Sequence, residues 1–264
     1  MTKRLLSVLL VFVMLVGALS SCKQPEKETD IGELISEADG HLDSQDHTVN
    51  ITMSFISEDD DMRAALEALD STSITYAKSG DNINIKLDVV FDNMFVNTSY
   101  TVVEDTLYNK IEINATGEIQ SLKQRSMLSP AERASVVRDA GAGAVLNHED
   151  FEDVSLEEND SVKIVTCKGI KDESAKTLVD LFKSAYGAST EAVSISDAEL
   201  VIRLLDGKYN GMYLTCNYAI TVSGVTYEVR LQMSREYDYT TPVSISAPED
   251  AAQYTLVPYD TIIE

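Results

Sequence analysis

The feature that most constrains the fold is the stretch 214–233, where apolar and polar residues alternate on both sides of Ser223-Gly224. A two-residue loop there suits a tight hairpin, because glycine tolerates the positive φ that such loops need. With this loop, one face of the hairpin holds only apolar pairs: Val222–Val225, Ile220–Tyr227, Tyr218–Val229, Cys216–Leu231 and Leu214–Met233. The other face holds mostly polar pairs: Thr221–Thr226, Ala219–Glu228, Asn217–Arg230 and Thr215–Gln232. A slip of one residue would mix the faces, so the pattern predicts a long antiparallel hairpin with one buried side.

A second run of alternating residues, 74–113, predicts a meander of antiparallel strands. We place its two-residue loops at Ser79-Gly80, Asp92-Asn93 and Glu104-Asp105, whose residue types favour tight turns. The predicted pairs are Tyr76–Ile83, Ile74–Ile85, Val89–Val96, Leu87–Thr98, Ile85–Tyr100, Val102–Leu107, Thr98–Ile111 and Val96–Ile113. Three independent turns give one continuous apolar face, which is stronger evidence for a sheet than any single strand.

Two segments carry apolar stripes at helical spacing and are expected to be amphipathic helices, 31–46 and 172–186. The stripes are Ile31, Leu34, Ile35, Ala38 and Leu42 in the first, and Ala175, Leu178, Val179, Phe182, Ala185 and Tyr186 in the second. Each helix therefore has a face that must be buried against the sheet.

Two further helices are indicated by their start signals. The acidic run 58–61 precedes a helix from about Met62, where carboxylates cap free amides; a calcium site is the alternative interpretation. Ser129 and Glu132 have the spacing of a capping box, with Pro130 at the first helical position, and this helix should stop at Gly141.

The remaining apolar alternation predicts strands over 47–57, 151–157, 161–170 and 198–206, and an extended segment over 243–251. The strand 198–206 must join the opening hairpin. A three-residue loop, Gly207-Lys208-Tyr209, would place Leu204 opposite Met212 and Leu200 opposite Cys216, and so keep the apolar residues on one side.

The first 21 residues are expected to be a signal peptide. Lys3 and Arg4 precede an apolar core over 5–19, which is short for a membrane span. Leu19-Ser20-Ser21-Cys22 then resembles a bacterial lipobox, in which Cys22 receives the lipid; a plain secreted protein is the alternative. Attached acyl chains would anchor the chain to the membrane. Residues 22–30 are polar and are expected to form a flexible tether, followed by a single domain over 31–264.

The charge excludes one class of partner. The 44 Asp and Glu residues outnumber the 21 Lys and Arg, for a formal net charge of −23. DNA and RNA are bound through cationic side chains, so we expect no nucleic-acid partner. Anionic lipid head groups are repelled too, so membrane attachment must come from the lipid on Cys22 rather than from a basic patch.

The sequence contains no pattern typical of an enzyme or of a cofactor site. It has no Gly-rich phosphate loop, no nucleophile elbow and no spacing of metal ligands, so we expect a non-catalytic protein without cofactor or metal. His148-Glu149-Asp150 could act in acid–base or metal chemistry, but polar residues ahead of a strand are the plainer interpretation. Cys167 and Cys216 lie on apolar phases of strands; export would allow a disulfide between them, and two buried free thiols are the alternative.

Taken together, the lipobox, the order of strands and helices and the closing Val243-Ser244-Ile245-Ser246-Ala247-Pro248-Glu249-Asp250-Ala251 resemble the LolA/LppX-like lipoprotein-carrier superfamily. The last segment is similar to a V-x-I-x-x-P-x-x-A ending of that family. The resemblance implies an α+β fold: a curved antiparallel sheet of about 10–11 strands, a half-open barrel, with helices packed on the concave side. Carriers proper are soluble, so the lipobox favours their membrane-anchored relatives.

The resemblance also implies a hydrophobic cavity for acyl chains. We therefore expect a lipoprotein on the outer face of the cell membrane that binds a lipid or glycolipid beneath its sheet. The candidate lining residues are Ile85, Leu87, Tyr100, Leu214, Tyr218, Tyr227 and Leu231. They could instead be ordinary core. The alternative function is an interaction or sensing lipoprotein without a cavity, whose acidic surface meets another envelope protein.

Overall fold

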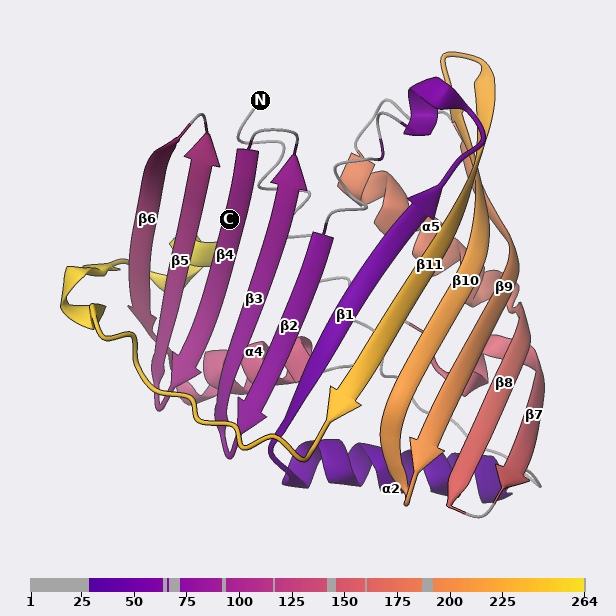
Figure 1. Ribbon diagram of the computed structural model, residues 1–264, viewed down its shortest axis with the longest axis horizontal. Helices are drawn as coiled ribbons and strands as arrows, with labels where there is room; N and C mark the ends of the chain where they lie inside the picture. The colour runs from indigo at the N-terminus through magenta and orange to yellow at the C-terminus, as the bar shows by residue number, and fades with distance from the viewer. Residues whose placement is uncertain are drawn as a thin grey trace.

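The computed structural model describes residues 29–63, 66, 72–91, 94–115, 117–141, 146–159, 161–186 and 192–263. Within these residues twelve strands form one open, twisted sheet (Figure 1). The strand order is β12-β6-β5-β4-β3-β2-β1-β11-β10-β9-β8-β7, and all neighbours are antiparallel except β12, which runs parallel to β6. A large open sheet with helices is thus confirmed, with twelve strands instead of 10 or 11. The predicted signal peptide and lipobox lie outside the described residues.

The strands are β1 His47–Ile56, β2 Thr72–Ser79, β3 Asn82–Phe91, β4 Met94–Val103, β5 Thr106–Ala115, β6 Glu118–Met127, β7 Phe151–Asn159, β8 Val162–Ile170, β9 Ala192–Leu205, β10 Lys208–Val222, β11 Val225–Asp238 and β12 Thr255–Leu256. The helices are α2 Thr29–Ser44, α4 Pro130–Gly141, α5 Asp172–Tyr186 and α6 Tyr259–Ile263, with short 3-10 turns at η1 His148–Asp150 and η2 Ala251–Gln253. Helix α2 begins at Thr29, two residues before the expected start of the domain at Ile31.

The long hairpin has the predicted register at every position. Val222 lies opposite Val225, and the ladder continues through Leu214 opposite Met233. Ser223 and Gly224 take φ of 52° and 76°, the left-handed region that a tight hairpin loop needs. The alternation of apolar and polar residues was therefore sufficient to fix this part of the sheet.

The registers of the meander are confirmed for two strand pairs and corrected for the third, while the predicted loop Asp92-Asn93 lies outside the described residues. The β3–β4 and β4–β5 registers are as predicted. In the β2–β3 turn, Ser79 pairs with Asn82, so the loop is Gly80-Asp81 and each residue of β2 meets a partner two positions later than expected. Asp46 explains the shift, because its carboxylate accepts hydrogen bonds from the Gly80 amide (2.7 Å) and the Ser79 hydroxyl (2.9 Å). A shift of two preserves the apolar face.

The register between β9 and β10 differs from the prediction. Leu204 pairs with Tyr209 instead of Met212, and Leu200 pairs with Leu214 instead of Cys216. The turn is the two-residue Asp206-Gly207, and the ladder shifts between Tyr209 and Gly211 and again between Thr215 and Asn217. The first irregularity places the Tyr209 ring on the apolar face of the sheet, opposite Leu204.

Strand β6 has no counterpart among the predicted elements. It pairs with β5 along its whole length, yet most of its side chains are polar and exposed. A strand at the edge of a sheet buries little, so the alternation that revealed the other strands is weak here.

One face of the sheet carries the core. We call the face with Val49, Ile85, Val96, Leu200 and Leu214 the inner face, and the other the outer face; all five side chains are buried. Helix α2 packs against β10 and α5 against β9. In Figure 1, α4 and α5 lie behind the sheet. The predicted stripe of α2 is correct, since Ile31, Ile35 and Ala38 join the same core.

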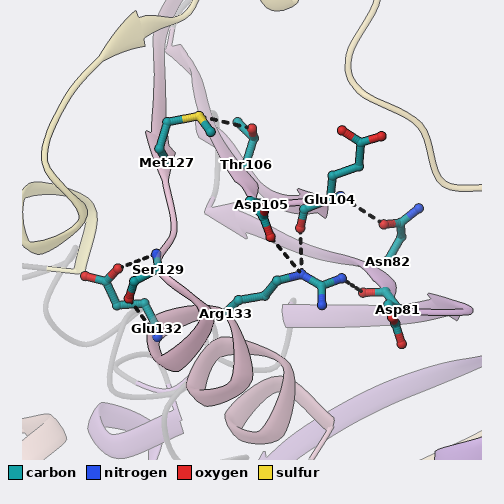
Figure 2. Close-up of polar contacts among 9 residues, drawn as sticks. All are labelled: Asp81, Asn82, Glu104, Asp105, Thr106, Met127, Ser129, Glu132 and Arg133. Atoms are coloured by element: carbon teal, nitrogen blue, oxygen red, sulfur yellow. Dashed lines mark hydrogen bonds and ion pairs between the residues drawn. The ribbon is translucent and has the colours of Figure 1, made fainter.

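The start of α4 is fixed by the side chains in Figure 2. The Glu132 amide donates to the Ser129 hydroxyl (3.3 Å), and the Ser129 amide donates to the Glu132 carboxylate (2.7 Å), which confirms the capping box. Arg133 donates from Nε to the Glu104 carbonyl (2.6 Å) and from Nη2 to the Asp81 carbonyl (2.9 Å). One arginine thus ties the helix to both the β2–β3 and the β4–β5 turns.

The segment after β11 crosses the ends of the N-terminal strands and reaches the β6 edge (Figure 1). The Ser79 hydroxyl donates to the Val243 carbonyl (3.1 Å), and Lys123 pairs with Asp250 at 2.6 Å. Strand β12 then adds to β6, and Ile262 of α6 is buried in the core. The expected segment 243–251 therefore runs along the ends of these strands, and β12, which follows it, pairs with the β6 edge.

Candidate ligand-binding site

The seven predicted lining residues all lie on the inner face, in two groups that β1 and β2 separate. The first group, on β3 and β4, is Ile85, Leu87 and Tyr100; the second, on β10 and β11, is Leu214, Tyr218, Tyr227 and Leu231. Five are buried in the core, while Tyr100 and Tyr227 are partly buried. Burial raises the pKa of Tyr100 to about 12. The structure thus places these residues in two patches of one apolar face.

The most unusual residue of the inner face is Arg235. It lies on β11 between Met212 of β10 and Ile51 of β1, and it is only 1% exposed. Its Nε and Nη2 have no hydrogen-bond partner among the described residues. Burial lowers the pKa of Arg235, because the charged form loses its hydration, while the neighbouring Tyr237 hydroxyl favours the charge. A buried cation with two unsatisfied nitrogens costs several kcal/mol, so its presence calls for an explanation.

Two stacked tyrosines lie beside this guanidinium. The rings of Tyr209 and Tyr237 are 5.3 Å apart with 26° between their planes. The Tyr209 hydroxyl donates to the Asp39 carboxylate of α2 (2.9 Å), whereas the Tyr237 hydroxyl donates to the sulfur of Met212 (3.1 Å). A thioether is a weak acceptor, so the Tyr237 donor is only weakly engaged. We refer to Arg235, Tyr237, Tyr209 and Asp39 as the Arg235 cluster.

The protonation of the cluster follows from its burial. Desolvation raises the pKa of both Tyr209 and Tyr237, and the Asp39 carboxylate raises that of Tyr209 further. Burial also raises the pKa of Asp39, partly offset by its bond to Tyr209. The phenols are therefore donors at neutral pH. Asp39 accepts its hydrogen bond from Tyr209, and no carboxylate among the described residues forms an ion pair with the Arg235 guanidinium.

The sequence held a signal for Arg235 that our prediction did not use. The predicted register ended at Leu214–Met233, and one more pair on the same face is Met212–Arg235. The alternation itself places this arginine in the apolar row. Tyr209 could not be found in this way, because the irregularity before Gly211 decides its side of the sheet.

A second pair of polar groups is buried in the N-terminal half of the inner face. Thr98 on β4 and Asn109 on β5 are 1% and 2% exposed, and Thr98 Oγ1 and Asn109 Oδ1 have no hydrogen-bond partner within the described residues. Asn109 lies opposite Tyr100 in the ladder. The inner face thus contains unsatisfied polar atoms on both sides of β1.

His47 is buried where β1 begins. Its Nδ1 lies 2.9 Å from the Gln45 carbonyl, and its ring lies 5.6 Å from Tyr76 and 5.5 Å from Tyr239. Burial lowers its pKa, so the imidazole is neutral in the folded chain at neutral pH. The aromatic surroundings make this a structural histidine.

Cys167 and Cys216 are both buried free thiols in the structure. They lie on β8 and β10 with β9 between them. Strands that are two apart are about 10 Å from one another, beyond the separation of about 7 Å that a disulfide spans. Of the two alternatives in the sequence, the structure has the free thiols. Burial raises the pKa of each to about 11.

The two acidic candidates for metal or acid–base chemistry have structural partners. Asp59 accepts a hydrogen bond from the Met62 amide (2.8 Å), as a helix cap does. Asp150 accepts from the Asn147 amide (2.6 Å) and the Ser174 hydroxyl (2.6 Å), which ties η1 to α5. In the part of the chain that the structure describes, no group of three His, Cys, Asp or Glu residues is placed to hold a metal ion.

None of the described helices is long and apolar enough to cross a membrane. Comparison of the chain with protein-family models and with curated proteins gave no match. The relation to the lipoprotein-carrier superfamily therefore stays a prediction, and so does the lipid on Cys22, which lies outside the described residues.

Proposed function

We propose that this protein is a membrane-anchored lipoprotein of the cell envelope that binds an apolar ligand, a lipid or glycolipid, on the inner face of its sheet. In this proposal Cys22 carries the anchor on the outer face of the membrane. The helices cover the concave side of the sheet incompletely, and the ligand occupies the hydrophobic space between them.

One observation carries the ligand part of the proposal: buried polar atoms without partners on an otherwise apolar face. Arg235 Nε and Nη2, Thr98 Oγ1 and Asn109 Oδ1 are of this kind. In a core without a ligand, each such atom lowers the free energy of unfolding, because it has lost its hydrogen bonds to water and gained none. Folded proteins keep few of these atoms. A ligand with polar atoms would satisfy them when it binds.

The share of the core that the helices provide supports the same proposal. Among the described side chains, α2 buries Ile31, Ile35 and Ala38 and α5 buries Leu178, whereas the remaining core comes mainly from the strands. Most of the described core side chains therefore belong to the inner face of the sheet, where the proposed ligand would bind.

The test is ligand binding by a soluble form that begins after Cys22. After gentle purification, native mass spectrometry should detect a bound lipid, and the delipidated protein should take up a fluorescent fatty acid with saturation at one molecule or a few per chain. Absence of both a co-purified lipid and any uptake would contradict the binding function.

The anchor needs a separate test. Metabolic labelling of expressing bacteria with an alkyne-bearing palmitate should label the full-length chain, and Cys22→Ala should abolish the label and release the protein from the membrane fraction. Labelling that survives Cys22→Ala would contradict anchoring through this cysteine.

A second candidate function, docking to another envelope protein, is favoured by the β6 edge. Ile119 and Met127 on its outer face are 68% and 63% exposed, and Leu256 of β12 is 61% exposed. Leu256 lies opposite Arg125 and so near Met127, whereas Ile119 lies at the other end of β6; exposed apolar side chains at a sheet edge suit contact with a partner. The test is chemical cross-linking in the envelope, with Ile119→Asp as the variant. If the parent chain cross-links to a partner protein, Ile119→Asp loses that cross-link and the parent chain takes up no lipid, this candidate replaces the first.

A further inference from the structure

We propose that Arg235 binds the head group of the ligand, and that the ligand is therefore an anionic amphiphile whose carboxylate or phosphate docks on Nε and Nη2. This inference rests on the proposed lipid-binding function. It adds the chemical class of the ligand and the residue that selects it.

The two unsatisfied nitrogens of Arg235 indicate the chemistry of the head group that would bind there. In a guanidinium, Nε–H and one N–H of Nη2 lie on the same edge of a plane and point in parallel, so they fit two oxygens of one carboxylate or phosphate. Both are the atoms of Arg235 that lack a partner. The two unsatisfied N–H groups of Arg235 thus form a two-pronged donor that matches an anion and that a single neutral hydroxyl cannot satisfy.

Tyr237 supplies a further donor at the same place. Its hydroxyl accepts a hydrogen bond from the guanidinium and donates its own proton to the sulfur of Met212, at 3.1 Å. A rotation of the O–H bond is enough to exchange this weak acceptor for an anionic oxygen. Tyr209 is already occupied by Asp39 and serves to hold the Tyr237 ring through their stacking.

The surroundings of Arg235 fit the remainder of such a ligand. From this residue the inner face of the hairpin continues without a charged side chain through Met212, Met233, Leu214, Leu231 and Val229. The six residue-to-residue steps of the strand from Arg235 to Val229 span roughly 20 Å, which is enough to lie along a long acyl chain. A ligand whose head group binds Arg235 would therefore place its acyl tail along this row, which includes the candidate lining residues Leu214 and Leu231.

The negative charge of the rest of the protein rules out non-specific binding as the source of a preference for anions. With a formal net charge of −23, the surface repels anions, so general adsorption cannot produce a preference for an anionic ligand. A preference for the acid over its neutral analogue would have to come from a local cation inside the fold.

The experiment compares three probes with one twelve-carbon tail: lauric acid, dodecyl phosphate and dodecanol. Their affinities for the soluble form that begins after Cys22 are measured by displacement of a fluorescent apolar dye. The variants are Arg235→Met, which removes the charge, and Arg235→Lys, which keeps the charge but not the two-pronged donor. Arg230→Met is the matched control, because Arg230 is exposed on the outer face of the same strand.

We expect the parent chain and Arg230→Met to bind at least one of the two anionic probes at least about tenfold more tightly than dodecanol. Arg235→Met should bind all three probes alike, and Arg235→Lys should keep a reduced preference. Which anion binds more tightly tells a carboxylate from a phosphate ligand. The readout is a ratio within one variant, so partial unfolding, which lowers all affinities, leaves it interpretable.

The outcomes separate the two proposals. If the parent chain binds dodecanol as tightly as both anions, or if Arg235→Met keeps the preference, the head-group inference is wrong while lipid binding stands. If none of the three probes binds the parent chain, the proposed function itself fails.

Discussion

Arg235 lies directly opposite Met212 in the β10–β11 ladder, so a guanidinium occupies one position in a row of otherwise apolar side chains. The arrangement follows from the register alone, because residues two apart on a strand share a face. The same pairing places Tyr237 within reach of the Met212 sulfur. A single position of the hairpin therefore combines a buried cation that has two unsatisfied nitrogens with a hydroxyl that donates only to a weak acceptor.

The first prediction concerns stability without ligand. Arg235→Met should raise the free energy of unfolding by about 1–4 kcal/mol, because an apolar side chain of similar length replaces a buried charge with two unsatisfied nitrogens. Urea denaturation of the delipidated protein measures this. Arg230→Met, on the exposed face, should change stability by no more than about 0.5 kcal/mol. A loss of stability in Arg235→Met would mean that the guanidinium has a structural partner in solution.

The second prediction concerns pH. Burial depresses the pKa of His47, so the folded state favours the neutral ring while the unfolded chain takes up a proton near pH 6.5. The stabilisation by neutral His47 is therefore fully present above pH 6.5 and is lost as the pH falls through the folded-state pKa. Urea midpoints between pH 7.5 and 5.5 should decline less in His47→Asn, which keeps a donor near Nδ1. An unchanged slope in that variant would contradict the buried neutral ring.

The third prediction concerns the α4 cap. Ser129→Ala should destabilise the protein by about 1 kcal/mol, because it removes the side-chain acceptor of the Glu132 amide. Glu132→Ala should have a similar effect, and the double variant should cost less than the sum, since the two residues form one capping box. Thermal or urea unfolding of the three variants measures the coupling, and strict additivity would argue against the reciprocal bonds.

The fourth prediction concerns the two thiols. Cys167 and Cys216 should react slowly with iodoacetamide at pH 8, because both are buried and their pKa is about 11. In urea both should react at once, without prior reduction. A form that begins after Cys22 contains only these two cysteines, so mass spectrometry counts the labels directly. A chain that needs reduction before it labels in urea would contradict the free thiols.

The sequence was most informative where one face of a strand pair is apolar and the other polar. Such alternation gave the register from Leu214 to Val225 without error, because any odd shift would bury polar residues. It could not detect the shift of two at Ser79, since even shifts leave the faces intact, and the deciding contact comes from Asp46, more than thirty residues away.

The candidate site was predictable only in part for the same reason. Leu214 and Leu231 belong to the alternating pattern, and Arg235 obeys it too, but a charged residue was not sought in an apolar row. Tyr209 depends on an irregularity in the ladder that no local pattern specifies. Asp39 reaches the cluster only through the packing of α2 on β10, which is a tertiary contact.

The central position of β1 governs the order in which the chain can assemble. Its Thr52 hydroxyl lies 2.7 Å from the Ser234 hydroxyl of β11, although 182 residues separate them in the sequence. While the polypeptide emerges from a ribosome or a translocase, β1 gains β2 early, but its other side has no neighbour until β11 appears. One edge of β1 therefore stays without a paired strand for most of the synthesis of the chain. A holdase chaperone that shields this unpaired edge would raise the yield of native protein.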